Sequence, residues 1–309
     1  MNASVTLPPN VFSVDVEEYF QVSAFESVFP RSDWDAVPSR LPDCLSRLLA
    51  LLDDRGVKAT FFVLGWIAER RPQLVAEIAA AGHEIACHGY DHRLVYRMSP
   101  TQFRDDVRRA KTAIENAAGT AVVSYRAPSF SVTRDSLWAL EVLVDLGFRN
   151  DASVFPIRHD RYGIPDAEPS PHQVVTPCGV IREFPGTTVR WVGCNVPFGG
   201  GGYLRLFPWA LTRRWMRRVR RRHGRPCMVY VHPWEIDPDQ PEVRGVSWLA
   251  RRRHRVGLRT TEVKLRRMLA EFRFTRLDWC LDALPLAAVP WDRYASGGRS
   301  RAERGRPKP

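Results

Sequence analysis

The sequence has almost no lysine, no closely spaced cysteine pair and no long apolar run. All but four of its 46 basic residues are arginine. The six cysteines are scattered and none forms a C-x-x-C pair, so we predict reduced thiols and no disulfide framework. No stretch approaches the roughly 20 apolar residues that span a bilayer. Residues 1–10 contain neither the basic nor the apolar segment of a signal peptide, so we expect a cytoplasmic location, or one peripheral to the inner membrane through a partner.

Positive charge dominates the composition. The 46 lysines and arginines exceed the 34 acidic residues, which gives a formal net charge of +12. A GC-rich genome, which favours arginine codons, accounts for a general excess of arginine. Two clusters, at 213–225 and 251–255, are denser than that average. Such clusters can attract an anionic polymer or surface, such as an acidic polysaccharide, a membrane surface or nucleic acid.

Strand-like and helix-like segments alternate in the first half of the chain. Apolar and β-branched residues at 11–16 predict a buried strand, and leucines at helical spacing over 42–54 predict a helix. The alternation predicts an α/β fold with a parallel sheet, open or closed into a barrel, whose functional side chains lie at the carboxyl ends of the strands. The other expected strands in this half are 58–64, 84–87, 122–126 and 148–151, and the other expected helices are 72–81, 99–118 and 133–146.

The alternation breaks after residue 155, where proline and glycine become dense. Long loops inside compact domains are usually functional, so we interpret this region as an excursion that forms a lid or wall over the site. Within it we expect a short strand at 180–185 and an arginine-rich helix from about 208 to 223. We predict a single domain over 1–285 and a basic, disordered tail at 286–309. Within that domain we place the core at 11–237, the excursion at 155–225 and a C-terminal extension at 238–285.

Two histidines, His88 and His92, stand four residues apart just after a short apolar strand. Histidine is the commonest nitrogen ligand for transition metals, and this spacing is usual for metal ligands. Asp15 and Glu17 lie at the end of the first strand, where side chains two residues apart share a face. One carboxylate could bind a metal beside the histidines while the other acts as a base. For the carboxylates alone, a solvated acidic strand end is the alternative.

Four further side chains lie at or near other predicted strand ends. Arg126 could orient a carboxylate bidentately or make an ordinary surface salt bridge. Asp151 could orient a catalytic histidine or belong to a turn. His232, where the strand 227–231 ends, could be a general acid near neutral pH or a core histidine. Trp234 could line a sugar groove or pack in the core.

These segments, in this order, resemble the polysaccharide deacetylases of the NodB-homology type, carbohydrate esterase family 4. The resemblance covers roughly residues 11–237 and includes 58–65 and 82–85. The motifs at 13–20 and 232–235 are closer still to a subgroup with an extra C-terminal region, which is associated with bacterial exopolysaccharide loci of the exosortase type. The resemblance implies a distorted, partly open (β/α) barrel and a divalent metal, commonly zinc. It also implies hydrolysis of N-acetyl groups on amino sugars.

The resemblance also implies roles for single residues. His88 and His92 would be metal ligands, and Asp15 would be the catalytic base. Arg126 would orient Asp15, while Asp151 would tune His232, the general acid. The expected substrate contacts within these motifs are Tyr90, Pro128 and Trp234.

The sequence departs from the family pattern at two positions. Most relatives have two adjacent aspartates in the first motif, the second of which binds metal, but here that position is Val16. Glu17 is the natural substitute because it shares a face with Asp15, although the reverse assignment, with Asp15 as ligand and Glu17 as base, remains open. In the second motif Gly89 replaces the usual serine or threonine and removes a hydroxyl group.

The sequence therefore predicts metal-dependent deacetylation of an N-acetylated polysaccharide or its lipid-linked precursor, in bacterial exopolysaccharide biosynthesis. Zinc is the expected metal, although histidine and carboxylate ligands also suit cobalt, nickel and manganese. One alternative is an amidohydrolase of the same fold that acts on a small cyclic amide. Another, suggested by the arginine clusters, is a non-catalytic binder of an anionic polymer. Nucleic acid is not an expected partner.

Overall fold

The structure is a computed structural model that describes residues 7–295. Most of its strands form one sheet in the order β10-β1-β2-β3-β4-β5-β7-β6-β12, with β11 also pairing with β1. The strands are β1 (Asn10–Val16), β2 (Thr60–Val63), β3 (Glu84–Cys87), β4 (Ser124–Tyr125), β5 (Asn150–Asp151), β6 (His172–Thr176), β7 (Gly179–Glu183), β8 (Thr188–Trp191), β9 (Cys194–Pro197), β10 (Met228–Val231), β11 (Phe274–Thr275) and β12 (Ala287–Pro290).

Neighbouring strands of the large sheet run parallel, except for the antiparallel pair β6 and β7. Within residues 7–295 the path ends at β10 on one side and β12 on the other, so the sheet is curved but not closed. The prediction of an α/β fold of the NodB type, with a partly open barrel, is confirmed.

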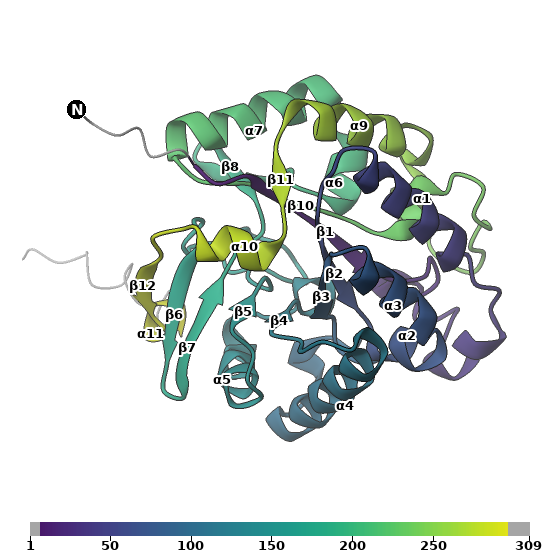
Figure 1. The fold of residues 1–309 in the computed structure, drawn as a ribbon, viewed down its shortest axis with the longest axis horizontal. Helices are drawn as coiled ribbons and strands as arrows, with labels where there is room; N and C mark the ends of the chain where they lie inside the picture. The colour runs from purple at the N-terminus through teal and green to yellow at the C-terminus, as the bar shows by residue number, and fades with distance from the viewer. Residues whose placement is uncertain (1–6, 296–309) are drawn as a thin grey trace, which may run out of the picture.

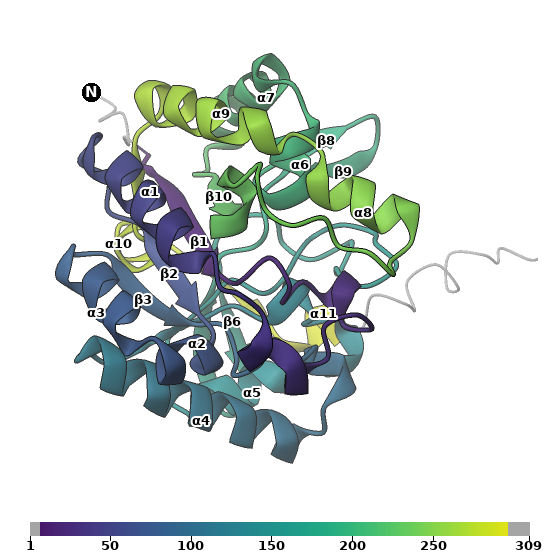
Figure 2. The ribbon, with the colours of Figure 1, turned by 90° about the vertical axis from the view of Figure 1, so that its right-hand side faces the viewer.

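Helices surround this sheet, with α7 and α9 along one side and α2, α3 and α4 along another (Figures 1 and 2). The helices are α1 (Leu41–Asp53), α2 (Gly65–Arg70), α3 (Pro72–Ala80), α4 (Pro100–Ala118), α5 (Trp138–Asp145), α6 (Gly201–Leu206), α7 (Trp209–His223), α8 (Trp248–Arg255), α9 (Leu258–Glu271), α10 (Leu277–Asp282) and α11 (Asp292–Ala295). Within the described residues, no helix is both long and apolar enough to cross a bilayer.

Local sequence signals explain why these elements begin and end where they do. All seven residues of β1 are buried, as its apolar sequence predicts for a strand covered on both faces. Helix α4 begins with a capping box, in which Ser99 and Gln102 each bind the other's backbone N–H, and it ends at Gly119 with φ +66°. These signals place α4 within a residue of the predicted 99–118.

Two expectations about the second half of the chain are wrong. Residues 155–225 do not form a loop over the site, because β6 and β7 join the main sheet, β8 and β9 form a hairpin, and α6 follows. Strand β7 and helix α7 do match the short strand expected at 180–185 and the helix expected at about 208–223. The tail does not begin at 286, because β12 pairs in parallel with β6. Residues 296–309 lie outside the described residues. Strand β12 could not be predicted from the sequence, because it is short and it is stabilised by pairing with the edge of β6.

Candidate active site

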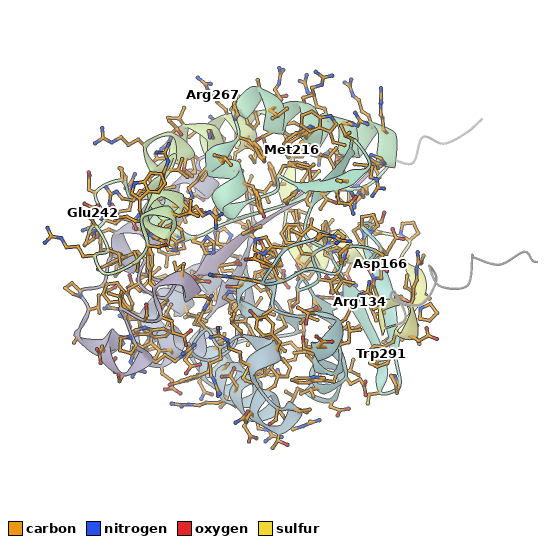
Figure 3. The ribbon with its side chains drawn as sticks, turned by 180° about the vertical axis from the view of Figure 1, so that it is seen from behind. Arg134, Asp166, Met216, Glu242, Arg267 and Trp291 are labelled. Carbon is orange, nitrogen blue, oxygen red and sulfur yellow. The ribbon has the colours of Figure 1, made fainter. Side chains whose placement is uncertain are left out.

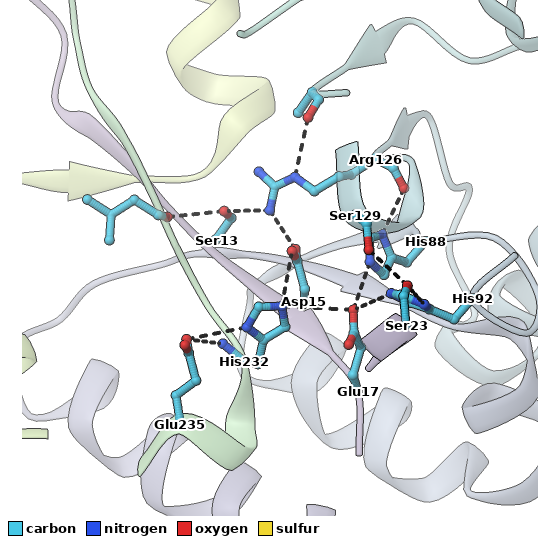
Figure 4. A network of polar contacts seen from close by, with 12 residues as sticks. Ser13, Asp15, Glu17, Ser23, His88, His92, Arg126, Ser129, His232 and Glu235 are labelled. Atoms are coloured by element: carbon cyan, nitrogen blue, oxygen red, sulfur yellow. Dashed lines mark hydrogen bonds and ion pairs between the residues drawn. The ribbon is translucent and has the colours of Figure 1, made fainter. Parts of the chain in front are cut away.

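Three buried side chains converge at the carboxyl ends of β1 and β3 (Figure 4). The Nε2 atom of His88 lies 3.0 Å from Glu17 Oε1, and the Nε2 atom of His92 lies 3.1 Å from the same oxygen. One ligand atom from each residue lies within 4.8 Å of the other two. Strand β1 delivers Glu17 and strand β3 delivers His88, since the two strands flank β2 and run parallel to it.

Outer hydrogen bonds orient both imidazoles toward Glu17. The Nδ1 atom of His88 lies 2.8 Å from the carbonyl oxygen of Arg126. The Nδ1 atom of His92 lies 3.3 Å from the hydroxyl of Ser23, which in turn contacts Ser129. His92 has φ +60°, a left-handed conformation that a non-glycine residue adopts only when its surroundings hold it there. Such partners fix the ring orientation of metal-binding histidines.

The donor set fits a divalent metal of the zinc type. Two imidazoles and one carboxylate are a common three-ligand set for catalytic zinc, which keeps its fourth position for water or substrate. Burial raises the pKa of Glu17, but attraction to His92 and His232 and hydrogen bonds with the two clustered histidines outweigh it, so the pKa lies well below its usual value. Glu17 is therefore a carboxylate at neutral pH, as a ligand must be.

Side chains alternate between the two faces of β1, and this alternation decides which acidic residues reach the cluster. Asp15 and Glu17 both lie on the site face, whereas the Glu18 carboxylate points away and accepts a hydrogen bond from the backbone N–H of Arg40 (3.1 Å). Val16 is 1% exposed and packs in the main hydrophobic core. Glu17, not position 16, thus joins the two histidines.

Replacing Val16 with aspartate should not create a metal ligand. The Val16→Asp carboxylate would lie in the apolar core without a cationic partner, so we expect a loss of roughly 3 kcal/mol or more in the free energy of unfolding. Denaturant unfolding measures this loss, and metal titration should show no gain in affinity. A Val16→Asp protein that stays as stable and binds metal more tightly would contradict the orientation of β1.

Asp15 is held by a buried arginine. Arg126 is fully buried and its Nη1 atom donates to Asp15 Oδ1 (2.5 Å) and to the hydroxyl of Ser13 (3.0 Å). Its Nε atom donates to the carbonyl oxygen of Ala152 (3.4 Å), and its guanidinium lies 4.0 Å from the ring centre of Phe62. The predicted partnership is present, but through one nitrogen instead of the bidentate contact, because Arg126 also binds these other groups.

His232 faces the cluster from the opposite side. Its Nε2 atom lies 3.9 Å from Asp15 Oδ2 and 3.9 Å from Glu17 Oε1. Its Nδ1 atom lies 3.3 Å from Glu235 Oε2. Burial lowers the pKa of His232, but Glu17, Glu235 and Asp15 raise it more, to about 9. The imidazole is therefore protonated at neutral pH and can donate a proton.

Glu235 is a candidate functional residue that the sequence motifs did not single out. It accepts a hydrogen bond from the backbone N–H of His232 (3.0 Å) and another from Arg205 Nε (2.6 Å). Burial raises the pKa of Glu235, but Arg205 and His232 lower it to about 2. Glu235 follows His232 by three positions, and this spacing could have indicated the contact between the two side chains. Nothing in the sequence indicated Arg205.

Arg205 is itself anchored by the C-terminal extension. Its side chain is 4% exposed, and its Nη1 atom donates to the carbonyl oxygens of Arg253 (3.1 Å), His254 (2.5 Å) and Val256 (3.0 Å). A chain of contacts thus runs from the C-terminal end of α8 through Arg205 and Glu235 to the imidazole of His232.

We expect Glu235→Gln to move the alkaline limb of the pH–rate profile toward neutral pH. The negative charge of Glu235 stabilises the protonated imidazole, so its removal lowers the pKa of His232 and deprotonates the acid at lower pH. The profile of kcat/KM against pH measures the shift, with the exposed Glu242→Gln as control. An unchanged alkaline limb would show that Glu235 does not tune His232.

Asp151 does not occupy the predicted place beside His232. Its Oδ1 atom accepts from the hydroxyl of Ser153 (2.6 Å) and its other oxygen from the backbone N–H of Ser153 (3.3 Å). Burial raises the pKa of Asp151, and burial together with the nearby Asp151 raises that of Glu183 well above its usual value. The prediction failed because β5 pairs with β7, which delivers Glu183, while Glu235 lies three residues after His232 itself.

The three expected substrate contacts are buried. Trp234 is 5% exposed and stacks between the rings of His232 (5.1 Å) and His254 (4.2 Å), so it supports His232 instead of lining a sugar groove. The hydroxyl of Tyr90 donates to Glu69 (2.7 Å) on the helical side. Pro128 is buried beside Gly89, whose φ is +75°. Only tertiary packing decides such exposure, because an aromatic motif suits a groove and a core equally.

Two family models match this chain, one in each half. Residues 33–150 match the family described as polysaccharide deacetylase, and residues 152–282 match a domain of unknown function, DUF3473. A chitooligosaccharide deacetylase of Bradyrhizobium sp. (strain ANU 289) is 35% identical over 120 residues, which are 38% of this chain and 53% of that protein. A peptidoglycan-N-acetylglucosamine deacetylase of Bacillus cereus is 33% identical over 96 residues, 31% of this chain and 35% of that protein.

The fold recurs in a crystal structure from Mycobacterium smegmatis assigned to the polysaccharide deacetylases. The TM-score is 0.55 at 23% identity, and the match covers 97% of this chain and 96% of that one. The chain matches only about half, or less, of the length of these two curated relatives.

A mostly parallel α/β sheet with buried histidines and carboxylates at its strand ends defines the class of the protein, an α/β protein with a candidate hydrolase site. More specifically, residues 33–150 match the polysaccharide deacetylase family, and residues 152–282 match the DUF3473 domain. The site draws on more than the deacetylase match at 33–150. Asp15 and Glu17 precede that segment, and His232 lies in the DUF3473 segment.

Proposed function

We propose that this protein removes acetyl groups from the amino sugars of an N-acetylated polysaccharide or its lipid-linked precursor, in a metal-dependent reaction. One observation carries the proposal: His232 Nε2 lies within 3.9 Å of both Asp15 and the Glu17 of the Glu-His-His cluster. The proposed base, the proposed acid and the candidate metal-binding set are therefore close enough to act on one bound acetyl group. The named relatives act on chitooligosaccharides and on peptidoglycan N-acetylglucosamine, which supports an amino-sugar substrate.

Each residue of the site has a separate role in the proposed amide hydrolysis. A divalent metal bound by Glu17, His88 and His92 would acidify a water molecule and polarise the acetyl carbonyl. The Asp15 carboxylate, oriented by Arg126, removes a proton from the attacking water. His232, kept protonated by its acidic neighbours, donates a proton to the amine nitrogen as the carbon–nitrogen bond breaks. Acetate and a free amino sugar are the products.

The direct test is acetate release from N-acetylglucosamine oligomers, measured with the purified full chain. We expect release that depends on added divalent metal and that a chelator stops. The same samples can be offered allantoin and cyclic imides, which tests the small-amide alternative. Turnover of cyclic amides without any acetate release from the oligomers would replace the proposed substrate class.

We also propose that the reaction belongs to bacterial exopolysaccharide biosynthesis on the cytoplasmic side of the membrane. The support is the resemblance of the motifs at 13–20 and 232–235 to the exopolysaccharide-locus subgroup. Deletion of the gene should leave the secreted polysaccharide more fully acetylated. An unchanged acetyl content would contradict this placement but would leave the enzymatic proposal standing.

A further inference from the structure

The hairpin of β8 and β9 carries exposed apolar side chains at its tip. Trp191 pairs with Cys194, so Val192 and Gly193 form a two-residue turn. Val192 is 87% exposed and Trp191 is 49% exposed. Single exposed apolar residues are common on protein surfaces, so exposure alone does not indicate a function.

The backbone of Val192 makes this tip unusual. Its φ is +45°, in the left-handed region that β-branched residues avoid because their side chains clash there. Two-residue hairpin turns favour asparagine or aspartate before glycine for this reason. Position 192 therefore holds an exposed, apolar, β-branched residue, although asparagine or aspartate would make this turn more stable.

The hairpin lies against an arginine-rich helix. The ring centres of Trp191 and Trp215 are 5.4 Å apart, which places the tip beside α7. Helix α7 also carries Arg213 and Arg217, which pair with Glu271 on the side of α9. Figure 3 shows α7 from behind, with its basic side chains extending outward from the molecule.

Of the five other arginines of α7, Arg220 donates to the carbonyl oxygen of Pro8 and to the side chain of Asn10. The other four form a stripe on the hairpin side, in which Arg218 is half-buried and the rest are exposed. At 100° per residue, Arg218 and Arg222 lie on the same side of the helix as Trp215, and Arg214 and Arg221 lie just beside them. Within residues 7–295, none of these four makes an ion pair. Arg190 of β8 is exposed next to the tip. We call this surface, made of Arg190, Trp191, Val192, Arg214, Arg218, Arg221 and Arg222, the hairpin–arginine surface.

We propose that the hairpin–arginine surface docks the protein on an anionic lipid bilayer. Arginine binds phosphate groups well, and each basic residue near an anionic membrane contributes attraction. Tryptophan favours the membrane interface, and an apolar tip gains by leaving water. A soluble polyanion would use the arginines but would leave Val192 and Trp191 in water, so the apolar tip favours lipid over a charged polymer or nucleic acid.

Vesicle co-sedimentation of the full chain tests this proposal without any measurement of hydrolysis. We expect binding to vesicles of equimolar phosphatidylglycerol and phosphatidylcholine at low salt, weaker binding as salt rises, and little binding to phosphatidylcholine alone. Absence of binding to the phosphatidylglycerol vesicles at low salt would overturn the proposal. It would leave the proposed deacetylation untouched, because no ion pair within residues 7–295 joins the site residues to this surface.

Two variants separate the charged from the apolar contribution. Arg218→Glu/Arg222→Glu should weaken vesicle binding by at least about tenfold, whereas Arg55→Glu/Arg149→Glu, an equal charge change at exposed sites elsewhere, should weaken it much less. Val192→Asn should also weaken binding while thermal stability stays equal or rises, because asparagine tolerates the left-handed conformation.

The outcome of these variants decides the partner. If Val192→Asn binds vesicles as tightly as the unchanged protein while the arginine variant does not, the surface is a polyanion site and lipid docking is wrong. Equal losses from Arg218→Glu/Arg222→Glu and Arg55→Glu/Arg149→Glu would show that net charge, and not this surface, attracts the vesicles.

Discussion

His88→Ala should abolish acetate release from N-acetylglucosamine oligomers. His88 Nε2 is one of two imidazole nitrogens within 3.1 Å of Glu17 Oε1, and its loss leaves too few ligands for a catalytic metal. A catalytic metal contributes several kcal/mol of transition-state stabilisation, so we expect a fall in kcat/KM of about a thousandfold or more. Acetate release and the metal content of the purified protein measure the two parts of the effect.

The control for this variant is His223→Ala, which removes an exposed histidine at the end of α7. Both proteins should fold, which circular dichroism checks. Chelation of the unchanged protein should reproduce the loss, and added zinc should restore activity to the chelated protein but not to His88→Ala. Full activity in His88→Ala, or activity that survives complete metal removal, would rule out the metal-dependent mechanism.

Asp15→Asn should lose activity while it keeps its metal, and Glu17→Gln should lose both. Glu17 contacts both histidines, whereas Asp15 contacts Arg126 and faces His232. Removal of a general base costs about a hundredfold to ten-thousandfold in rate. Metal analysis beside acetate release distinguishes the two carboxylates. Loss of metal in Asp15→Asn together with retention in Glu17→Gln would reverse their assigned roles.

The Asp15→Asn variant also leaves the Arg126 guanidinium buried without its anionic partner. Breaking a buried ion pair from one side typically costs 3–5 kcal/mol of stability, so unfolding must be measured alongside activity. Activity should be compared at a temperature where both proteins are folded. A rate loss that disappears under that condition would indicate a structural role for Asp15 and not a catalytic one.

The DUF3473 region has a direct part in the candidate site. It supplies His232 and Glu235, and it anchors Arg205 through three backbone carbonyls that follow or end α8. The extension beyond β10 therefore fixes the charge that keeps His232 protonated. The proposed acid therefore lies in the DUF3473 match, whereas the two histidines lie in the deacetylase match.

Short-range rules determined much of the fold and part of the site. The capping box and Gly119 set the ends of α4, and the two-residue period of β1 put Asp15 and Glu17 on one face. The spacing of His88 and His92 marked the cluster. These features depend on neighbours within a few residues along the chain, so the sequence alone contains the information that fixes them.

Tertiary structure alone decided which distant groups meet these residues. Arg205 lies 30 residues from Glu235, and the pairing of β5 with β7 sends Asp151 to Glu183 instead of His232. The burial of Trp234 between two imidazoles follows from the packing of the segment that contains His254. No local pattern encodes such contacts, because each depends on where the sheet order and the packing of the C-terminal extension bring separate parts of the chain together.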